Sequence, residues 1–169
     1  IHQYTDSIYK VCKFKRSTYC GPPVSDEKEE PDNEGKLDNA FSRARSMVKQ
    51  YALCNQWSYF LTLTLDASKF DRYDLSRFQA ALSQWIRDER KKYRRLYGDD
   101  VPRLSVLLVP ENHKVGAWHM HGLVSGLPLS ETSEFVPGVH PRKLIDKHFL
   151  NWPSYAADFG FASLGAVRD

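Results

Sequence analysis

A predicted β-hairpin in the second half of the chain constrains the fold more than any other feature of the sequence. Two runs with strand composition, Arg103–Val109 and Ala117–Val124, flank a short polar turn at Asn112–Gly116. Runs this close together along a chain pair as antiparallel neighbours. His119 and His121 lie two residues apart on the second strand, so both imidazoles project from the same face of the sheet.

Whether Glu111 joins the two histidines depends on the register of the hairpin. If the turn has the five residues Asn112–Gly116, Glu111 pairs with Ala117 and lies diagonally opposite His119, with roughly 7–8 Å between the two backbones. A turn one residue shorter would direct Glu111 to the other face. In the first register, two imidazoles and a carboxylate form a mixed set with open positions, which suits Mg²⁺ or Mn²⁺ and leaves Zn²⁺ as an alternative. Two histidines on an exposed strand are also common as ordinary polar surface, and that interpretation stays open.

The other periodic segments indicate an α+β fold. The chain has 169 residues, of which 41% are hydrophobic, enough for one domain with a full core. The order strand, helix, hairpin, helix favours a central antiparallel sheet with helices packed on one face. The last residues, Asn151–Asp169, show no clear period. The predicted elements outside the hairpin are a helix at Leu37–Cys54, a strand at Trp57–Leu65, a helix capped by Asp71 or Asp74 with an apolar stripe from Leu75 to Leu96, and a weaker helix at Pro141–Leu150.

Charge is distributed unevenly along a chain whose formal net charge is only +3. An acidic connector at residues 24–35 begins with VSDEKEEPDNE, which has six acids and one lysine, and we expect a solvated loop there. Without Val24–Glu34 the chain has 23 basic and 15 acidic residues. A second run, Arg87–Arg95, has six basic residues and two acids. A solvated helix face is the simpler interpretation of this run, because phosphate contacts would require a site beside it.

Cysteine usage and hydropathy bear on the compartment. Cys12, Cys20 and Cys54 include no CxxC pair, which argues against a zinc knuckle and favours a reducing cytosol. No apolar run approaches the roughly 20 residues needed to cross a bilayer, and the residues after Ile1 have no signal-peptide pattern. We therefore expect a cytoplasmic protein without a membrane partner.

Three motifs in order resemble those of the HUH endonucleases, and most closely the rolling-circle replication initiators of bacteriophages. They are FLTLTLD at Phe60–Asp66, a carboxylate closing a strand in VPENHKVG, and WHMHGLV at Trp118–Val124, whose histidine–hydrophobic–histidine unit names the family. The resemblance extends over roughly Leu37 to Gly165. It implies one HUH domain with a ferredoxin/RRM-like antiparallel sheet, helices behind it, and metal ligands at Glu111, His119 and His121.

The activity implied by this resemblance is site-specific nicking and rejoining of single-stranded origin DNA. A Mg²⁺ or Mn²⁺ ion would polarise the scissile phosphate, and a tyrosine would attack phosphorus to give a 5′-phosphotyrosine and a free 3′-hydroxyl. The sequence contains no GxxxxGK[ST] phosphate loop, so we expect a separate helicase of a bacterial host to unwind the DNA.

The nucleophile is where the sequence departs from the family pattern. The family places its tyrosine on a helix after the histidines, typically as Tyr-x-x-Lys. Tyr155 is the tyrosine that follows His121 here, and Asp158 stands where the lysine would be. We expect the tyrosine helix to lie beyond Asp169, with Tyr155 as nucleophile, or a loss of cleavage, as the alternatives.

DNA contacts are expected from polar residues on the sheet and from basic residues on other segments. Thr62 and Thr64 alternate with core leucines, so their hydroxyls either meet DNA or pair across the sheet. The basic candidates for DNA contact are Arg43, Arg45 and Lys49 on the predicted first helix, with Lys13, Lys15 and Arg16 near the start of the chain.

A single-tyrosine transposase or relaxase, and a DNA-binding module that does not cleave, remain alternative functions.

Overall fold

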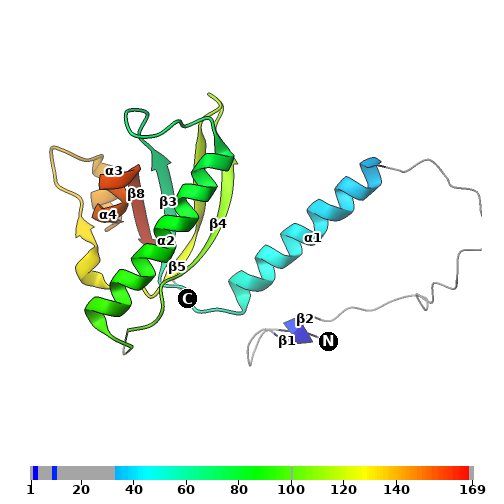
Figure 1. Cartoon of the computed structure of the whole chain (residues 1–169), viewed down its shortest axis with the longest axis horizontal. Helices are drawn as coiled ribbons and strands as arrows, with labels where there is room; N and C mark the ends of the chain where they lie inside the picture. Colours follow the sequence, from blue (N-terminus) through cyan, green and yellow to red (C-terminus); the bar gives the residue numbers. More distant parts are fainter. Residues whose placement is uncertain (1, 4–8, 11–32, 100, 168–169) are drawn as a thin grey trace, which may run out of the picture. The chain divides into compact units, whose positions relative to one another are not determined.

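The computed structural model describes residues 2–3, 9–10, 33–99 and 101–167 (Figure 1). The chain divides into two compact units, Ile1–Asn55 and Gln56–Asp169.

The first unit contains a short strand pair and one long helix. Strand β1 (His2–Gln3) pairs antiparallel with β2 (Tyr9–Lys10), and helix α1 spans Asn33–Leu53. The helix starts before the predicted boundary at Leu37, so residues 33–35 of the predicted acidic connector are helical and not loop. The remainder of that connector lies outside the described residues.

The second unit is α+β, with helices packed against a six-stranded antiparallel sheet, as the order of predicted elements indicated. The strand order across the sheet is β4-β5-β3-β8-β7-β6. The strands are β3 (Tyr59–Leu65), β4 (Ser105–Asn112), β5 (Trp118–Ser125), β6 (Ser133–Glu134), β7 (Leu150–Asn151) and β8 (Gly160–Ala166).

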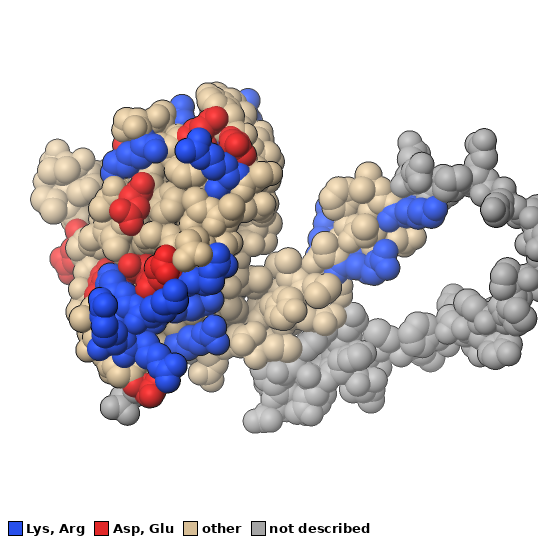
Figure 2. Space-filling view, viewed as in Figure 1, with Lys and Arg blue, Asp and Glu red and all other residues tan. Residues whose placement is uncertain are grey.

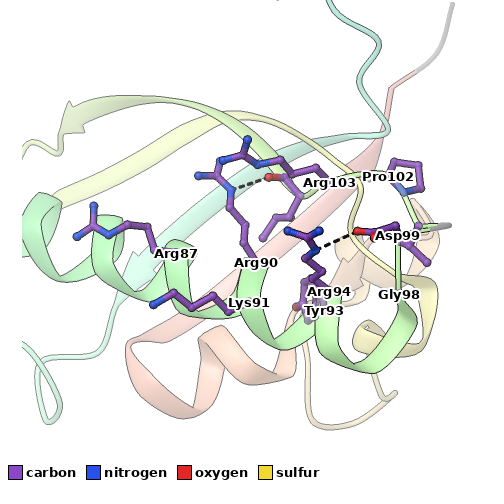
Figure 3. Close-up of a pocket in the computed structure, with 11 residues that line it drawn as sticks. Arg87, Arg90, Lys91, Tyr93, Arg94, Gly98, Asp99, Pro102 and Arg103 are labelled. Carbon is purple, nitrogen blue, oxygen red and sulfur yellow. Dashed lines mark hydrogen bonds and ion pairs between the residues drawn. The ribbon is translucent and has the colours of Figure 1, made fainter.

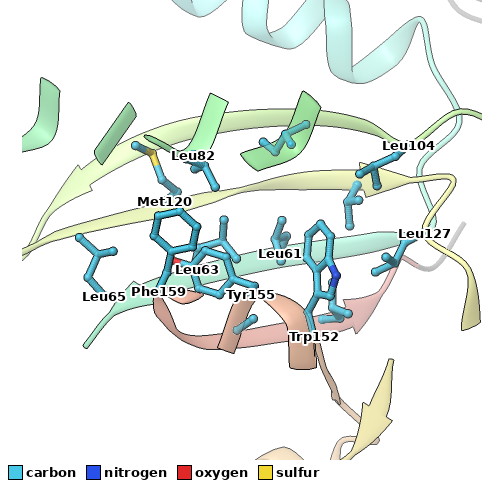
Figure 4. Close-up of a cluster of buried hydrophobic side chains, with 14 of the residues drawn as sticks. Leu61, Leu63, Leu65, Leu82, Leu104, Met120, Leu127, Trp152, Tyr155 and Phe159 are labelled. Carbon is cyan, nitrogen blue, oxygen red and sulfur yellow. The ribbon is translucent and has the colours of Figure 1, made fainter. Parts of the chain in front are cut away.

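Alternation along β3 separates a buried face of the sheet from a polar face. Leu61 and Leu63 are 0% and 1% exposed, and they meet helix α2 (Leu75–Tyr97) in the core (Figures 1 and 4). Asp74 is the N-cap of α2, since its carboxylate accepts a hydrogen bond from the backbone N–H of Arg77 at 2.9 Å. The prediction of helices on one face of the sheet is therefore confirmed for α2.

The C-terminal region is more ordered than its sequence pattern indicated. Helix α4 (Pro153–Asp158) and strand β8 fill the stretch that lacks a clear period, and β8 pairs with β3 along its whole length. Residues 162–165 of β8 are all buried, so the strand shows no alternation of apolar and polar residues. This segment packs into the core beside α2 through three aromatic side chains, Trp152, Tyr155 and Phe159 (Figure 4).

The weaker predicted helix at Pro141–Leu150 is helical over half of its length. Helix α3 covers only Arg142–Asp146. The chain leaves the helix through His148, whose φ of 53° is left-handed, and then enters β7. Between β5 and α3, the short 3-10 helix η1 (Leu129–Glu131) precedes β6.

Candidate functional site

The β4–β5 hairpin pairs in a register two residues away from the predicted one. Glu111 lies directly opposite His119, whereas the sequence predicted Ala117 as its partner. The predicted strand ended at Val109, but β4 continues to Asn112, so the turn moves to residues 113–117. Because a shift of two residues keeps every side chain on its own face, Glu111 still shares a face with both histidines.

Two threonines of β3 hold the two imidazoles from the neighbouring strand. Thr64 pairs with His119 and Thr62 with His121. In each pair the threonine Oγ1 lies 3.1 Å from Nδ1 of the imidazole. Engaging Nδ1 makes Nε2 the nitrogen of each ring that can meet another group, as in proteins where a second hydrogen bond orients a metal-binding histidine. The sequence suggested these hydroxyls as DNA contacts or cross-strand pairs, and the structure gives them the imidazoles as partners.

The carboxylate of Glu111 contacts one of the two imidazoles directly. Its Oε2 lies 2.8 Å from Nε2 of His121, and the two side chains are 67% and 32% exposed. This pair spans β4 and β5 diagonally, since His121 stands opposite Val109 in the register. A carboxylate and both imidazoles therefore meet on one accessible patch of the sheet.

The three donors do not surround a common point. Within the described residues, no group of three His, Cys, Asp or Glu side chains is placed to hold one ion. The rings of His119 and His121 are nearly parallel, with centroids 6.3 Å apart and planes inclined by 7°. Two nitrogens with bonds of about 2.1 Å to one ion lie at most about 4.2 Å apart. The donor chemistry fits a divalent cation, but the side chains would have to rearrange to share it.

Arg72 adds a positive charge beside this patch, and nothing in the sequence pattern singled it out. Its carbonyl accepts a hydrogen bond of 2.9 Å from the backbone N–H of Trp118, which ties the loop after β3 to the start of β5. Its Nε is buried and has no hydrogen-bond partner among the described residues. Buried polar atoms without partners are rare in folded proteins. The positive charge of Arg72 is close enough to His119 to lower the pKa of that imidazole.

The surroundings of His119 favour its neutral form. Partial burial is the largest cause that lowers its pKa below the ordinary value of 6.5. Positive charge at His113, His121 and Arg72 acts in the same direction, while Glu111 opposes it. The ring of His113, an exposed residue of the turn, lies 5.5 Å from that of His119, so His113 borders the site. A neutral imidazole is the form that ligates metals.

An exposed aromatic ring flanks the polar residues. Phe60 is 48% exposed, and its ring stacks on His121 with centroids 6.2 Å apart and an interplanar angle of 21°. Val109, which is 43% exposed, lies opposite His121 on β4. The polar patch therefore has a flat apolar margin of the kind on which nucleic-acid bases stack.

The same face of the sheet is covered further along, at β8. The ring of Phe135 stacks on Phe161 with centroids 5.6 Å apart. Phe149 occupies the space above Gly165, where an added Cβ would come within 2.9 Å of its ring. These contacts restrict the accessible patch to β4, β5 and β3.

The structure places Tyr155 in the core, away from the histidines. Its side chain is 0% exposed, and burial raises its pKa. Its hydroxyl donates a long hydrogen bond of 3.4 Å to the carbonyl of Thr64. Because its ring packs among the core residues of α2 and α4, we assign Tyr155 to the core and not to a nucleophilic role.

Of the six basic residues predicted to contact DNA, three belong to α1 and three lie outside the described residues. Arg43, Arg45 and Lys49 belong to α1 in the first unit. Lys13, Lys15 and Arg16 lie outside the described residues. Contact of these six residues with DNA stays a prediction.

No protein-family model, curated protein or solved structure matches this chain. Among the helices that the structure describes, none has the length and apolar character needed to cross a bilayer. Function is therefore argued from the residues of the site.

Proposed function

We propose that the chain is a metal-dependent HUH endonuclease that nicks and rejoins single-stranded DNA at a replication origin. The observation that carries this proposal is the pair of imidazoles on β5, each held at Nδ1 by a threonine of β3, with the carboxylate of Glu111 on the same accessible face. This arrangement presents two oriented nitrogens and one oxygen to a ligand arriving from solvent.

The order of elements supports the finer fold assignment to the ferredoxin/RRM-like class. Strands β3, β4, β5 and β8, with α2 after the first and α4 before the last, follow the β-α-β-β-α-β sequence of that class. In the sheet β3 and β5 are central to this set, with β4 and β8 outside them. The histidines and their threonines thus lie on the two central strands.

In this proposal Glu111 and the Nε2 atoms of His119 and His121 hold Mg²⁺ or Mn²⁺. Binding would replace the present Glu111–His121 hydrogen bond with two bonds to the cation. A divalent cation supplies polarisation of a non-bridging phosphate oxygen. The threonines keep the imidazoles oriented, and the neutral form of His119 leaves its nitrogen free to bind.

Other residues of the patch would position the DNA. Phe60 offers a surface for stacking an unpaired base beside the phosphate. The positive charge of Arg72 near His119 would stabilise negative charge on the phosphoryl group. A separate helicase of a bacterial host would expose the single strand, since the sequence has no phosphate loop.

The proposed covalent step needs a tyrosine hydroxyl. The phenol releases its proton as its oxygen attacks phosphorus, the bond to the 3′-oxygen breaks, and that oxygen takes up a proton to become the 3′-hydroxyl. The family resemblance places this tyrosine on a helix after the histidines. Tyr73 is a second candidate, because it is 59% exposed and its ring lies beside Gly116 in the hairpin turn.

The test uses the complete protein and a pool of 3′-labelled single-stranded oligonucleotides with a random internal region. With Mn²⁺, we expect a labelled protein band that survives SDS, and the attached fragments should begin at one shared sequence. His119→Ala and His121→Ala should remove the band. Tyr73→Phe removes it only if Tyr73 is the nucleophile.

His148→Asn is the matched control for the histidine substitutions. His148 is exposed and has a positive φ of 53°, which asparagine adopts readily. This variant should form the adduct at the normal yield. The absence of any adduct or cleavage over the whole pool would contradict the proposal, and an adduct unaffected by His121→Ala would contradict the metal assignment alone.

A second candidate function is binding of single-stranded nucleic acid without cleavage. The contact between Glu111 and His121 favours it, because the two groups satisfy each other without an ion. Phe60 and Val109 would then act as a stacking surface. Sequence-selective binding with no adduct, and no dependence on Mn²⁺, would support this function in place of the first.

A further inference from the structure

A basic hollow lies between the C-terminal half of α2 and the chain that leads into β4. It has a volume of about 710 Å³ and is separate from the histidine patch in its lining (Figure 3). Tyr93 and Leu104 form its buried floor. The charged residues of its lining are Arg87, Arg90, Lys91, Arg94, Asp99 and Arg103.

The hollow concentrates more positive charge than the chain has in total. Five basic residues and one acid line it, a balance of +4 against a formal net charge of +3 for all 169 residues. Figure 2 shows the corresponding cluster of Lys and Arg over the C-terminal half of α2. Arg87, Lys91 and Arg94 are spaced by one helical turn, so their charges follow one line along the helix.

The cations in the hollow are less neutralised than another lysine of the same helix. Lys92 contacts Glu89 of the same helix at 3.1 Å and Glu131 at 2.9 Å, and the second contact links α2 to η1. In the hollow, Arg94 pairs with Asp99 at 2.9 Å and Lys91 pairs with Asp88 at 3.3 Å. All four side chains are more than half exposed, so these pairs contribute little. Arg103 has no ion-pair partner among the described residues.

Arg90 and Arg103 face the hollow as neighbouring like charges. Nε of Arg90 donates a hydrogen bond of 2.7 Å to the carbonyl of Leu104, which fixes the guanidinium at the rim (Figure 3). Burial and the charge of Arg103 both lower the pKa of Arg90. Two guanidinium groups close enough to repel each other are stabilised when an anion lies between them.

We propose that this hollow binds the phosphodiester backbone of duplex DNA, as a second DNA contact on the helix side of the sheet. Several cations in line match a chain of phosphates better than a single phosphate ion. Its aromatic residue, Tyr93, is 4% exposed, so no ring of the lining is open to stack an unpaired base, in contrast to Phe60. A flat membrane surface would reach the rim but not the recess.

This inference goes beyond the proposed function, because binding to the hollow requires neither metal nor cleavage. A protein with both contacts would hold the duplex next to an origin while the sheet engages the single strand. The two proposals therefore fail independently.

The test measures fluorescence anisotropy of a labelled random-sequence duplex with the full chain over a series of KCl concentrations. Lys91→Gln/Arg103→Gln changes two exposed residues of the lining. We expect about a tenfold loss of duplex affinity, and a slope of log affinity against log salt that is smaller by about 2, one for each lost phosphate contact. Adduct formation on a short single strand should not change.

Lys143→Gln/Lys147→Gln is the matched control, because it removes two exposed lysines at α3 and changes net charge equally. It should retain affinity and slope. An equal loss in this control would overturn the inference, because net charge alone would explain the binding. Loss of duplex affinity in both Lys91→Gln/Arg103→Gln and Arg87→Gln/Arg94→Gln, with no loss in the control, would support it.

Competition separates the backbone from other anionic ligands. Unlabelled duplex should displace the labelled probe, whereas inorganic phosphate at the same phosphate concentration should not. Displacement by inorganic phosphate, or binding to phosphatidylserine vesicles in place of duplex, would overturn the assignment. Equal loss of single-strand binding in Lys91→Gln/Arg103→Gln would overturn the preference for duplex.

Discussion

The two faces of the central sheet differ in composition and in what their substitution should affect. On the helix-covered face, Leu61, Leu63 and Met120 are buried at 0–2% exposure. On the other face, the same strands present hydroxyls and imidazoles that hydrogen-bond across β3 and β5. Because successive residues of a strand point to opposite faces, one strand supplies both the core and the candidate site. Substitutions of core-facing residues should therefore mainly lower stability, and substitutions of their neighbours on the accessible face should mainly affect binding or chemistry.

The largest effect is expected from truncating a leucine of β3. Leu63→Ala should lower the free energy of unfolding by about 2–5 kcal/mol, because it leaves a cavity between the sheet and α2. Urea unfolding followed by circular dichroism measures this change. The neighbouring substitution Thr62→Ala on the accessible face should cost less than about 1.5 kcal/mol. A comparable cost for the two variants would contradict the division into two faces.

The threonines should matter for metal binding more than for stability. Thr62→Val and Thr64→Val remove the hydroxyls that hold Nδ1 of the imidazoles while keeping the side-chain shape. We expect Mn²⁺ affinity to fall by about 10–100-fold in each, measured by electron paramagnetic resonance of free Mn²⁺. Serine at either position restores a hydroxyl and should recover most of the affinity. Unchanged affinity in both valine variants would show that the hydroxyls do not orient metal ligands.

A smaller effect is expected from the aromatic margin of the polar face. Phe60→Ala should weaken single-strand binding by about 1–3 kcal/mol through the loss of one stacked base. Binding of duplex to the hollow beside α2 serves as the internal control and should not change. If both kinds of DNA lost affinity equally, Phe60 would not be a stacking residue.

The smallest effect concerns the protonation of His119. In the metal-free protein its NMR titration should have a midpoint below 6.5, because partial burial and neighbouring positive charge lower its pKa. Since the unfolded chain binds this proton more readily, stability should decrease as the pH falls from 6.5 toward the folded-state pKa. Arg72→Gln removes one of the neighbouring charges and should move the midpoint upward. A midpoint above 6.5 in the unmodified protein would contradict this account.

Local patterns in the sequence predicted β3, α2 and the hairpin. The leucine alternation of β3 and the Asp74 cap of α2 are signals carried by a few adjacent residues. The predicted register of the hairpin was wrong by two residues, because the composition of the turn alone did not determine where strand pairing ends. Glu111 kept its face nevertheless, since that depends only on whether the shift is even or odd.

The C-terminal strand shows why burial on both faces conceals a strand. Strand β8 lies between β3 and β7, where side chains on both of its faces are covered, so apolar and small residues do not alternate. The run ASLG at residues 162–165 is all buried. A short apolar run of this kind is compatible with a buried strand but is weak on its own.

The sequence by itself determined the side-chain chemistry that the chain can offer: two histidines on one face of a strand, a carboxylate at the end of the preceding strand, and threonines alternating with leucines. Tertiary structure decided what these groups contact. Pairing of β5 with β3 set each threonine against an imidazole, and the hydrogen bond from the backbone N–H of Trp118 to the carbonyl of Arg72 holds Arg72 near His119. It also placed the basic run of α2 next to Arg103, on the helix side of the sheet. Contacts between segments far apart in the chain depend on strand order and packing, and local periodicity carries no information about either.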